Sequence, residues 1–363
     1  MKAFSVLFFA GICVILAART LYAEVAVGNC RPHLVSYSTI SEAVAAVPPN
    51  STVLVCPGVY PEQVTINQPL TLRGLSEGIS SRAVITVPSG GILSSFGQAE
   101  QLSVQGTDFP TSGPVDIRNL VVDGIGSGFD CSTGTLVGIA YQFADGTVDN
   151  VEVRNQNPGG CGFGIVLTGD PFLVNTVNVR NSSIHDFDNT GVLATSGGET
   201  GFLVNLTSNW IQSSSTSVQA GVDYDFTDGL AARNTIIVAG NFGLLLDNFF
   251  AGMTVHENLI IGPNTGIYSG GSLPFSPTVI TGNTLFNNGT GIFISETSGN
   301  DVVKSNTIFH SRTAAIDLDC SEKTTAEKNV IFGAPVGIAN ITSGDTVTEN
   351  VIYSVLTATT ACP

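Results

Sequence analysis

An asparagine recurs along most of the chain at intervals of 21 to 31 residues, and each one adjoins a short apolar stretch. A glycine that opens a short apolar segment follows most of these asparagines, as at Gly191, Gly221 and Gly266. A further apolar patch precedes each asparagine, so one interval contains three short β-prone segments. The chain must therefore stack one small unit many times. The recurring residues are Asn119, Asn150, Asn181, Asn209, Asn234, Asn258, Asn283, Asn306, Asn329 and Asn350.

This repeat predicts an all-β solenoid in which each interval forms one coil of a parallel β-helix. Coils would stack about 4.8 Å apart, and each asparagine would lie at a bend, with its amide bonded to the backbone and to the same amide one coil away. A β-sandwich gives no reason for this spacing, and the Leu-x-x-Leu-x-Leu pattern of leucine-rich repeats is absent. We expect one domain over residues 24–363, with roughly 11 to 12 coils and its most regular part over 119–355.

Residues 1–23 have the pattern of a secretory signal peptide, with Lys2 before an apolar run and small residues at the exit up to Ala23. The alternative is a membrane anchor, for which the uninterrupted apolar run is short. No later segment of the sequence is apolar for long enough to span a bilayer. We therefore predict a secreted, periplasmic or extracellular protein that is free of the membrane after signal cleavage, and we expect a monomer.

Six cysteines follow the leader, and an even number in an exported chain predicts disulfides. The sequence contains no CxxC spacing, which disfavours a zinc or redox site. Cys131 and Cys161 lie 12 and 11 residues after the asparagine of their coils, so they should face each other on adjacent coils. The other four would then hold the two ends of the solenoid. The expected pairs are Cys30–Cys56, Cys131–Cys161 and Cys320–Cys362.

A short helix is predicted at residues 39–47. Thr39 and Glu42 have the spacing of a capping box, and the apolar stripe that follows includes Ile40 and Val44. A β-helix exposes strand edges at each end, which invite aggregation unless they are covered. We expect this helix to cover the N-terminal end of the solenoid.

Three N-terminal segments resemble the opening of pectin-lyase-like proteins of the right-handed parallel β-helix superfamily: YSTISEAV at 37–44, TVLVCPGVYPE at 52–62 and LTLRG at 70–74. The resemblance covers most of the chain and implies a right-handed solenoid. It implies no reaction, because the Asp-Pro-His run of alginate-epimerase-like sites is not matched: Asp170-Pro171 is followed by Phe172. The marks of polygalacturonase-like hydrolases and of pectinesterases are also missing, so no catalytic subfamily is matched.

The strand-opening glycines also locate candidate site residues. Strand side chains alternate, so the second and fourth residues after each glycine should face outward. These positions hold three carboxylates on two neighbouring coils, then two aromatic side chains, then a second acidic pair. Carboxylates can move protons, and aromatic rings stack on the apolar face of a sugar. The candidate catalytic residues are Asp223, Asp225 and Asp247, and the candidate substrate-binding residues are Tyr268, Phe293, Asp317 and Asp319. The alternative is that these aspartates only keep the protein soluble.

A second polar group, His185, Asp186 and Asp188, precedes Gly191. These residue types can hold a metal ion or transfer protons. We favour the simpler interpretation, a polar turn between two coils.

The formal net charge of −16 argues against nucleic acid as a partner. It would also repel a polyuronate unless calcium bridged the two, so calcium is a possible cofactor and no other is predicted. Two functions remain open. One is a secreted protein that binds or processes a polysaccharide, with a hydrolase or lyase-like reaction if it is an enzyme. The other is a non-catalytic structural or surface scaffold.

Overall fold

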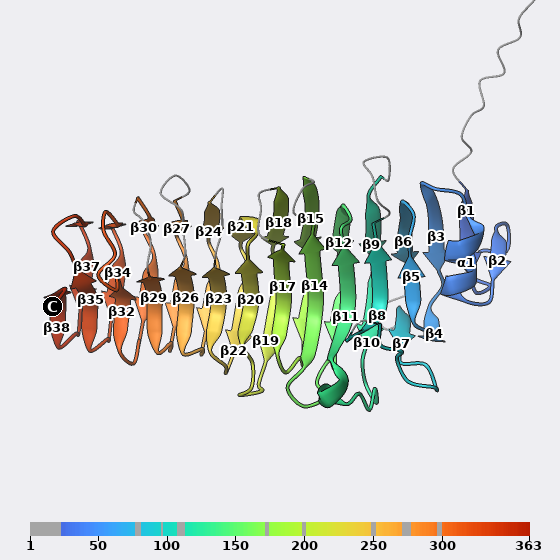
Figure 1. Cartoon of the computed structure of the whole chain (residues 1–363), viewed down its shortest axis with the longest axis horizontal. Helices are drawn as coiled ribbons and strands as arrows, with labels where there is room; N and C mark the ends of the chain where they lie inside the picture. The colour runs from blue at the N-terminus through green and yellow to red at the C-terminus, as the bar shows by residue number, and fades with distance from the viewer. Residues whose placement is uncertain are drawn as a thin grey trace, which may run out of the picture.

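The computed structural model describes residues 23–76, 81–95, 97–106, 113–170, 174–197, 201–247, 252–270, 277–295 and 300–363. Within them the chain winds into an elongated solenoid with three parallel sheets along its length (Figure 1). We name them sheet A, with 14 strands, and sheets B and C, with 12 strands each. Twelve strands per sheet agree with the expected number of coils, and the predicted all-β parallel solenoid is confirmed.

Each coil contributes one strand to each sheet. Strands whose numbers differ by three are therefore neighbours in a sheet along most of the chain. Sheet A contains β1 Glu24–Val27, β2 Val35–Tyr37, β3 Ser51–Val55, β6 Leu70–Gly74, β9 Val115–Arg118, β12 Gly146–Asp149, β15 Asn175–Arg180, β18 Phe202–Thr207, β21 Asp228–Ala232, β24 Met253–His256, β27 Val279–Thr281, β30 Val302–Lys304, β33 Thr325–Glu327 and β36 Thr346–Thr348. Sheet B contains β4 Gly58–Pro61, β7 Ala83–Thr86, β10 Leu120–Asp123, β13 Glu152–Arg154, β16 Ser183–His185, β19 Trp210–Ser213, β22 Thr235–Val238, β25 Leu259–Ile261, β28 Thr284–Phe286, β31 Thr307–Phe309, β34 Val330–Phe332 and β37 Val351–Tyr353. Sheet C contains β5 Val64–Ile66, β8 Gln98–Gln105, β11 Thr135–Gln142, β14 Gly162–Gly169, β17 Thr190–Ser196, β20 Ala220–Asp225, β23 Phe242–Asp247, β26 Thr265–Gly270, β29 Thr290–Ser295, β32 Ala314–Asp317, β35 Val336–Ile341 and β38 Thr357–Ala361.

The helix α1, Ile40–Ala46, covers the N-terminal end of the solenoid as predicted (Figure 1). The Thr39 hydroxyl accepts a hydrogen bond from the Glu42 backbone N–H, which is the expected cap. The Glu62 carboxylate adds a second cap, because it accepts from the backbone N–H groups of Ile40 and Ser41 at 2.7 and 3.0 Å. Ile40, Ala43 and Val44 are buried against the first coil.

The recurring glycines of sheet C are required because sheet B packs very close to sheet C at these positions. A Cβ at Gly243 would lie 2.5 Å from Ile260 Cγ2 on sheet B and 2.5 Å from the Gly266 carbonyl oxygen on the next coil. No side chain fits there without moving backbone. Small residues at this position allow sheet B to pack directly on sheet C, and the interior is otherwise filled by aliphatic side chains.

An internal asparagine ladder runs through the later coils. In Asn258, the side-chain Nδ2 donates to the Ala231 carbonyl and to Asn283 Oδ1, both at 2.9 Å. Its Oδ1 accepts from the backbone N–H and the Nδ2 of Asn234 at 2.9 and 3.0 Å. The same pattern repeats from coil to coil, so the predicted internal row is confirmed for these residues: Asn209, Asn234, Asn258, Asn283, Asn306, Asn329 and Asn350.

The prediction of an internal position is wrong for Asn119, Asn150 and Asn181. Their backbone φ angles are 58°, 54° and 53°. Their side chains bond outside the coil: Asn150 Nδ2 donates to Asn119 Oδ1, and Asn181 Nδ2 donates to Asp149 Oδ1, both at 2.9 Å. The interior position in these coils belongs to the following residue. In these coils the asparagine stands one residue before the inward-facing position. A shift of one residue moves a side chain from the inner to the outer face of the coil.

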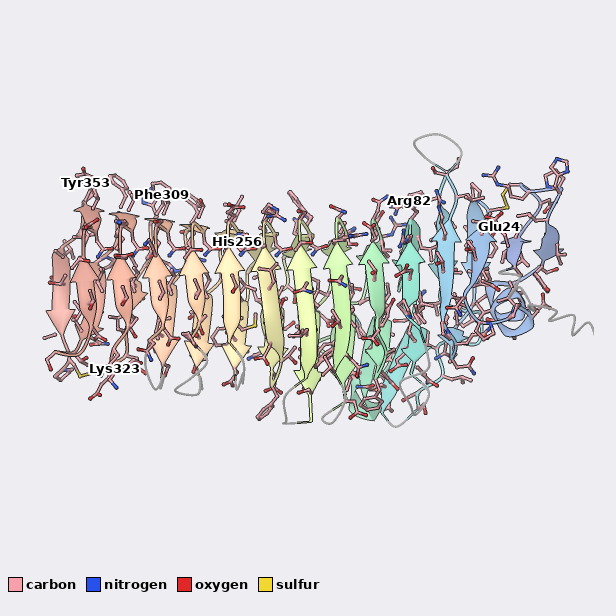
Figure 2. All side chains as sticks on the ribbon, turned by 90° about the horizontal axis from the view of Figure 1, so that it is seen from above. Glu24, Arg82, His256, Phe309, Lys323 and Tyr353 are labelled. Atoms are coloured by element: carbon pink, nitrogen blue, oxygen red, sulfur yellow. A yellow bond between two sulfur atoms is a disulfide. The ribbon has the colours of Figure 1, made fainter. Side chains whose placement is uncertain are left out.

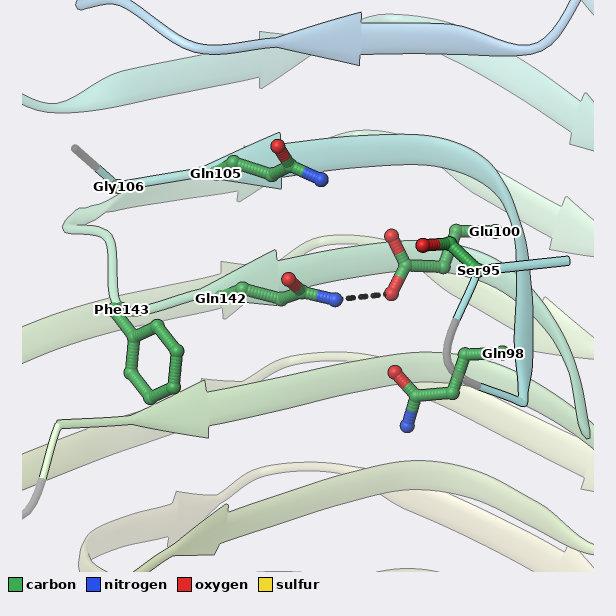
Figure 3. Close-up of a pocket in the computed structure, with 7 residues that line it drawn as sticks. All are labelled: Ser95, Gln98, Glu100, Gln105, Gly106, Gln142 and Phe143. Carbon is green, nitrogen blue, oxygen red and sulfur yellow. Dashed lines mark hydrogen bonds between the residues drawn. The ribbon is translucent and has the colours of Figure 1, made fainter.

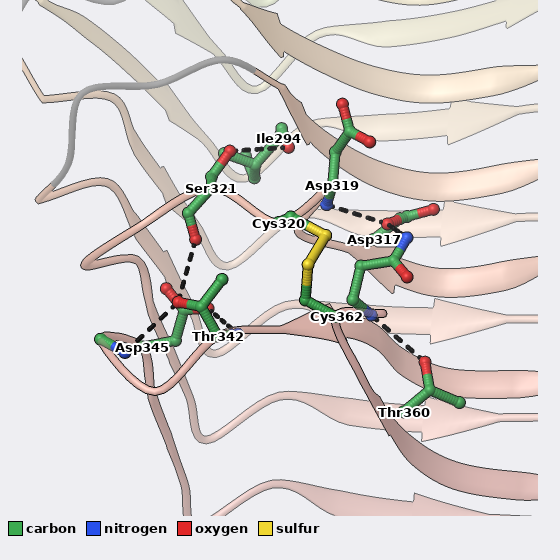
Figure 4. The surroundings of a disulfide bond; sticks show 11 residues. Ile294, Asp317, Asp319, Cys320, Ser321, Thr342, Asp345, Thr360 and Cys362 are labelled. Carbon is green, nitrogen blue, oxygen red and sulfur yellow. Dashed lines mark hydrogen bonds between the residues drawn. A yellow bond between two sulfur atoms is a disulfide. The ribbon is translucent and has the colours of Figure 1, made fainter.

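All three predicted disulfides are present. The Cα–Cα distances are 5.7 Å for Cys30–Cys56, 5.6 Å for Cys131–Cys161 and 5.4 Å for Cys320–Cys362. Cys30 and Cys56 flank α1 in the sequence, and Cys320–Cys362 joins the turn after β32 to the residues that follow β38 (Figure 4). Disulfides agree with an oxidising compartment. The predicted signal peptide lies almost wholly outside the described residues.

Sheet B exposes a hydrophobic stripe towards the C-terminal end. The side chains of Phe309 and Tyr353 project from sheet B near that end of the molecule (Figure 2). Phe286 and Phe332 are paired with Phe309 on the two neighbouring strands, and their side chains are 43% and 39% exposed. The described residues contain no helix that is long and apolar enough to cross a membrane.

Candidate functional site

The outward positions of sheet C align as the sequence predicted. In one row, Asp223 is paired with Leu193 on the preceding strand and Leu245 on the following one. In the second row, Asp225 is paired directly with Asp247. Paired residues on neighbouring parallel strands lie about 4.8 Å apart. Asp223, Asp225 and Asp247 therefore form one acidic cluster on β20 and β23.

Asp223 is the most perturbed carboxyl of the acidic cluster. Burial, with added repulsion from Asp225 and Asp247, raises its pKa from 3.8 to about 7. Its Oδ1 is buried and has no hydrogen-bond partner, whereas Asp225 Oδ2 accepts from the Thr195 hydroxyl at 3.4 Å. Because the neutral acid avoids both the desolvation penalty and the repulsion, Asp223 retains a proton at a pH where surface aspartates are ionised.

An aromatic row follows the acidic cluster on the next coils. Tyr268 and Phe293 are paired residues, with ring centroids 5.6 Å apart and planes within 10° of parallel. Phe242 meets the Tyr268 ring edge-on at 5.5 Å. Sequence reasoning missed Phe242, which stands directly before a strand-opening glycine, and an outward column read one residue before each glycine would have found it. We name Phe242, Tyr268 and Phe293 the aromatic row.

The Tyr268 ring leans towards the acidic cluster. An added Cβ at Gly270 would lie 2.7 Å from the Tyr268 hydroxyl, so the ring covers this glycine. Gly270 is paired with Asp247. The Tyr268 hydroxyl therefore lies one coil away from the Asp247 position, and the aromatic and acidic groups form one continuous surface.

Asp317 and Asp319 lie beyond the aromatic row, close to the Cys320–Cys362 disulfide (Figure 4). Asp317 is paired with Phe293, as predicted. Asp317 Oδ1 accepts from Asn340 Nδ2 at 2.8 Å and from the Asp319 backbone N–H at 3.0 Å. Asp319 Oδ2 accepts from the Ser295 hydroxyl at 2.8 Å. Both carboxylates thus help to hold the turn after β32, in addition to any contact with a ligand.

The residues near Gly191 form the polar turn that we favoured. Asp188 is buried and accepts from the backbone N–H groups of Gly159, Gly160 and Gly162 at 2.5 to 2.7 Å. His185 instead contacts Asp186, with 2.6 Å between Nδ1 and Oδ2. In the part of the chain that the structure describes, no three His, Cys, Asp or Glu side chains are arranged to hold a metal ion.

Comparison with known proteins agrees with the fold. A family described as "Right handed beta helix region" matches residues 274–352. Comparison with curated proteins finds no match.

Solved structures with the same architecture include DFA-IIIase from Arthrobacter chlorophenolicus A6 without its lid, at 12% identity and a TM-score of 0.53, covering 84% of this chain and 88% of that one. The A-module of a mannuronan C-5 epimerase from Azotobacter vinelandii is 16% identical with a TM-score of 0.49, covering 86% and 93%. An alginate lyase from Paenibacillus is 14% identical with a TM-score of 0.45, covering 94% and 97%.

Proposed function

The chain is a right-handed parallel β-helix, and we propose that the outward face of its sheet C binds a polysaccharide along the acidic cluster and the aromatic row. The parallel stack of Tyr268 and Phe293 beside Asp223 and Asp247 is the observation that carries this proposal. Aromatic rings present a flat apolar surface to a sugar ring, and neighbouring carboxylates accept hydrogen bonds from its hydroxyls. The proposal places the protein outside the cytoplasm, in keeping with its disulfides.

The acidic cluster has the residue types that hydrolysis of a glycosidic bond requires. A carboxyl group whose pKa is raised to about 7 can donate a proton to the glycosidic oxygen, and here that group is Asp223. Asp225 or Asp247 would serve as the ionised partner, either activating water or attacking the sugar. The two outward columns carry no lysine or arginine that could take a proton from a uronate, so hydrolysis is favoured over a lyase reaction.

The charge of this face selects among polysaccharides. The acidic residues of this face and the net charge of −16 repel a polyuronate, whereas a neutral glycan meets no such repulsion. Calcium remains a prediction: because no three His, Cys, Asp or Glu side chains among the described residues are arranged to hold a metal ion, oxygen ligands from the glycan would help to bind it.

The test is a binding screen of purified protein against neutral and uronate polysaccharides, each with and without calcium. We expect a neutral glycan to bind and Tyr268→Ala or Phe293→Ala to weaken its binding by about tenfold or more, since stacked aromatic contacts contribute about 0.5–1.5 kcal/mol beyond the area they bury. Phe286→Ala is the matched control, because it removes an exposed aromatic side chain from sheet B.

Catalysis is tested separately with Asp223→Asn, which keeps the shape of the side chain and removes its proton. We expect this variant to bind the glycan and to lose turnover. If Asp223→Asn, Asp225→Asn and Asp247→Asn all bind and turn over every ligand as the parent does, the site lies elsewhere. Absence of all glycan binding by the parent would instead favour the non-catalytic scaffold.

A further inference from the structure

A polar pocket lies on sheet C near the N-terminal end, several coils away from the acidic cluster (Figure 3). Its cavity of about 360 Å³ is lined by Ser95, Gln98, Glu100, Gln105, Gln142 and Phe143. The volume is within the range of roughly 300–1,000 Å³ that small-molecule sites occupy. We name it the amide pocket, because three of its side chains are glutamines.

Glu100 is the central group of the amide pocket. It is 8% exposed, and one of its carboxylate oxygens accepts from Gln142 Nε2. Among the residues that the structure describes, no lysine, arginine or histidine forms an ion pair with it. A buried carboxylate normally has its lone pairs satisfied by donors, so this one is ready to accept further hydrogen bonds from a ligand.

Ser103 carries a buried, unsatisfied hydroxyl on the same face of β8. It lies between Glu100 and Gln105 on β8, and strand alternation puts its side chain on the same side as that of Gln105. Ser103 is 4% exposed, and its Oγ has no hydrogen-bond partner. A buried hydroxyl without a partner costs free energy. Ser103 does not line the amide pocket itself, whose polar lining comes from Ser95, Glu100 and the three glutamines.

The rim of the amide pocket is held firmly. The Gln63 side chain bonds to both the backbone N–H and the carbonyl of Leu93, at 3.0 and 2.9 Å, and to the Glu100 carbonyl at 2.9 Å. Ser95 and Gln98 exchange two backbone hydrogen bonds of 2.9 and 3.0 Å. Leu93, Ser95 and Gln98 are thereby fixed beside the sheet, so this rim of the pocket is formed before any ligand arrives.

The opposite rim depends on an unusual backbone at Phe143. Its φ of 54° lies in the left-handed region, and its N–H donates to the Thr168 carbonyl at 2.8 Å. The Phe143 ring is 48% exposed and lies at the end of the Gln142 strand (Figure 3). It offers an apolar surface next to the polar floor, which is the combination that sugars bind.

We propose that the amide pocket is a binding site for an uncharged, polyhydroxylated small molecule, namely a neutral monosaccharide or the end residue of a neutral glycan. Each amide offers both donors and acceptors, and a sugar hydroxyl is both donor and acceptor. An anion would face Glu100, which forms no ion pair with a described residue, and the net charge of −16. A purely cationic ligand would leave the amide N–H donors without partners. The inference stands whether or not the acidic cluster is catalytic.

The experiment is ligand-detected NMR and titration calorimetry with a panel of neutral monosaccharides and disaccharides, together with glucuronate and glucosamine as charged probes. We expect at least one neutral sugar to bind more tightly than either charged probe. Glu100→Gln should raise its Kd by about tenfold, because a hydrogen bond to a charged acceptor is stronger than one to a neutral amide. Gln142→Met should have a similar effect.

Controls separate a lost site from a lost fold. Glu349→Gln and Gln219→Met make the same chemical changes at exposed positions elsewhere and should leave the Kd unchanged. Gln105→Ala changes an exposed side chain of the pocket and should weaken binding with no change in circular dichroism or melting temperature.

Four results would overturn the proposal. They are that no neutral sugar of the panel binds, that Glu100→Gln and Gln105→Ala bind as the parent does, that a charged probe binds best, or that Tyr268→Ala loses the same binding, which would move the sugar to the aromatic row. Failure of the polysaccharide screen, by contrast, leaves the expected result here unchanged.

Discussion

The early and late coils use the same residue at the same bend in two different ways. In the early coils, Asn119, Asn150 and Asn181 occupy the left-handed backbone position and face outward. In the late coils, the left-handed position belongs to residues such as Arg233 and Glu257, and the asparagine that follows points inward. Asparagine tolerates positive φ better than other residues with a side chain, and its amide can also bridge coils. The recurring asparagine therefore has two separate physical roles, one in the early coils and one in the late coils.

Two aspartates, one in each half, differ in how their carboxylates are stabilised. Asp123 in the early half is desolvated, which raises its pKa, but hydrogen bonds from Asn155, Ile125 and Arg154 lower the pKa below its usual value overall. Among the residues that the structure describes, none donates a hydrogen bond to Asp223 Oδ1 in the late half, and burial raises the pKa of Asp223 to about 7. Stabilised carboxylates belong to structural networks, whereas an unsatisfied one is typical of a functional site.

The largest expected effect breaks the ladder. Asn258→Gly removes four buried hydrogen bonds and leaves the Asn234 backbone N–H without its acceptor. We expect a loss of about 4 kcal/mol in the free energy of unfolding, at about 1 kcal/mol per bond. Denaturant unfolding measures it. A loss below about 1 kcal/mol would mean that the ladder is not a principal source of stability.

The next effect concerns the early half, where the Cys131–Cys161 disulfide joins adjacent coils. Replacing both cysteines by serine should lower the free energy of unfolding by about 3 kcal/mol, because the bridge restricts the unfolded chain. Thermal melting of the variant and of the parent under non-reducing conditions measures the difference. Equal melting temperatures, with the bridge verified in the parent by mass mapping, would contradict this expectation.

Asp223→Asn should stabilise the protein, and the gain should depend on pH. Its pKa is raised to about 7 in the folded state, so the folded protein binds more protons than the unfolded chain between about pH 4 and 7. The contribution of protonated Asp223 to the stability of the fold is complete below the pKa that Asp223 has in the unfolded chain. This contribution is lost as the pH rises through the pKa that Asp223 has in the folded protein. We expect the variant to be more stable by about 2 kcal/mol at pH 8 and by less than about 0.5 kcal/mol at pH 4.

Denaturant unfolding at the two pH values checks this prediction, with Asp123→Asn as the opposite control. Asp123 has a lowered pKa, so its contribution is present above the unfolded pKa and is lost as the pH falls through the folded pKa. Asp123→Asn should therefore destabilise at neutral pH. The same sign of effect for both variants would remove the contrast between the two halves.

The smallest expected effect is Asn150→Gly. Glycine adopts the φ of 54° without strain, and the lost bond to Asn119 is exposed. The free energy of unfolding should change by no more than about 0.5 kcal/mol. The identical substitution at Asn258 is expected to cost about eight times as much, so comparable losses at the two sites would refute the distinction between early and late coils.

The sequence by itself determined the period, and with it a large part of the structure. A fixed interval with three β-prone segments can satisfy its backbone only by stacking, so the solenoid, the disulfide pairs and the outward columns from Asp223 to Phe293 were all predictable. The cap of α1 was predictable too, because Thr39 and Glu42 interact over one local turn.

Tertiary structure alone decided the features that depend on a shift of one residue or on a segment outside the repeat. Whether an asparagine faces inward depends on which of two adjacent residues takes positive φ, and the packing of three sheets sets this. The raised pKa of Asp223 depends on its burial, which the sequence does not contain. The amide pocket brings Ser95, Glu100 and Gln142 together from a non-repeating loop and two strands. Its geometry arises from contacts distant in sequence, and no period in the chain encodes them.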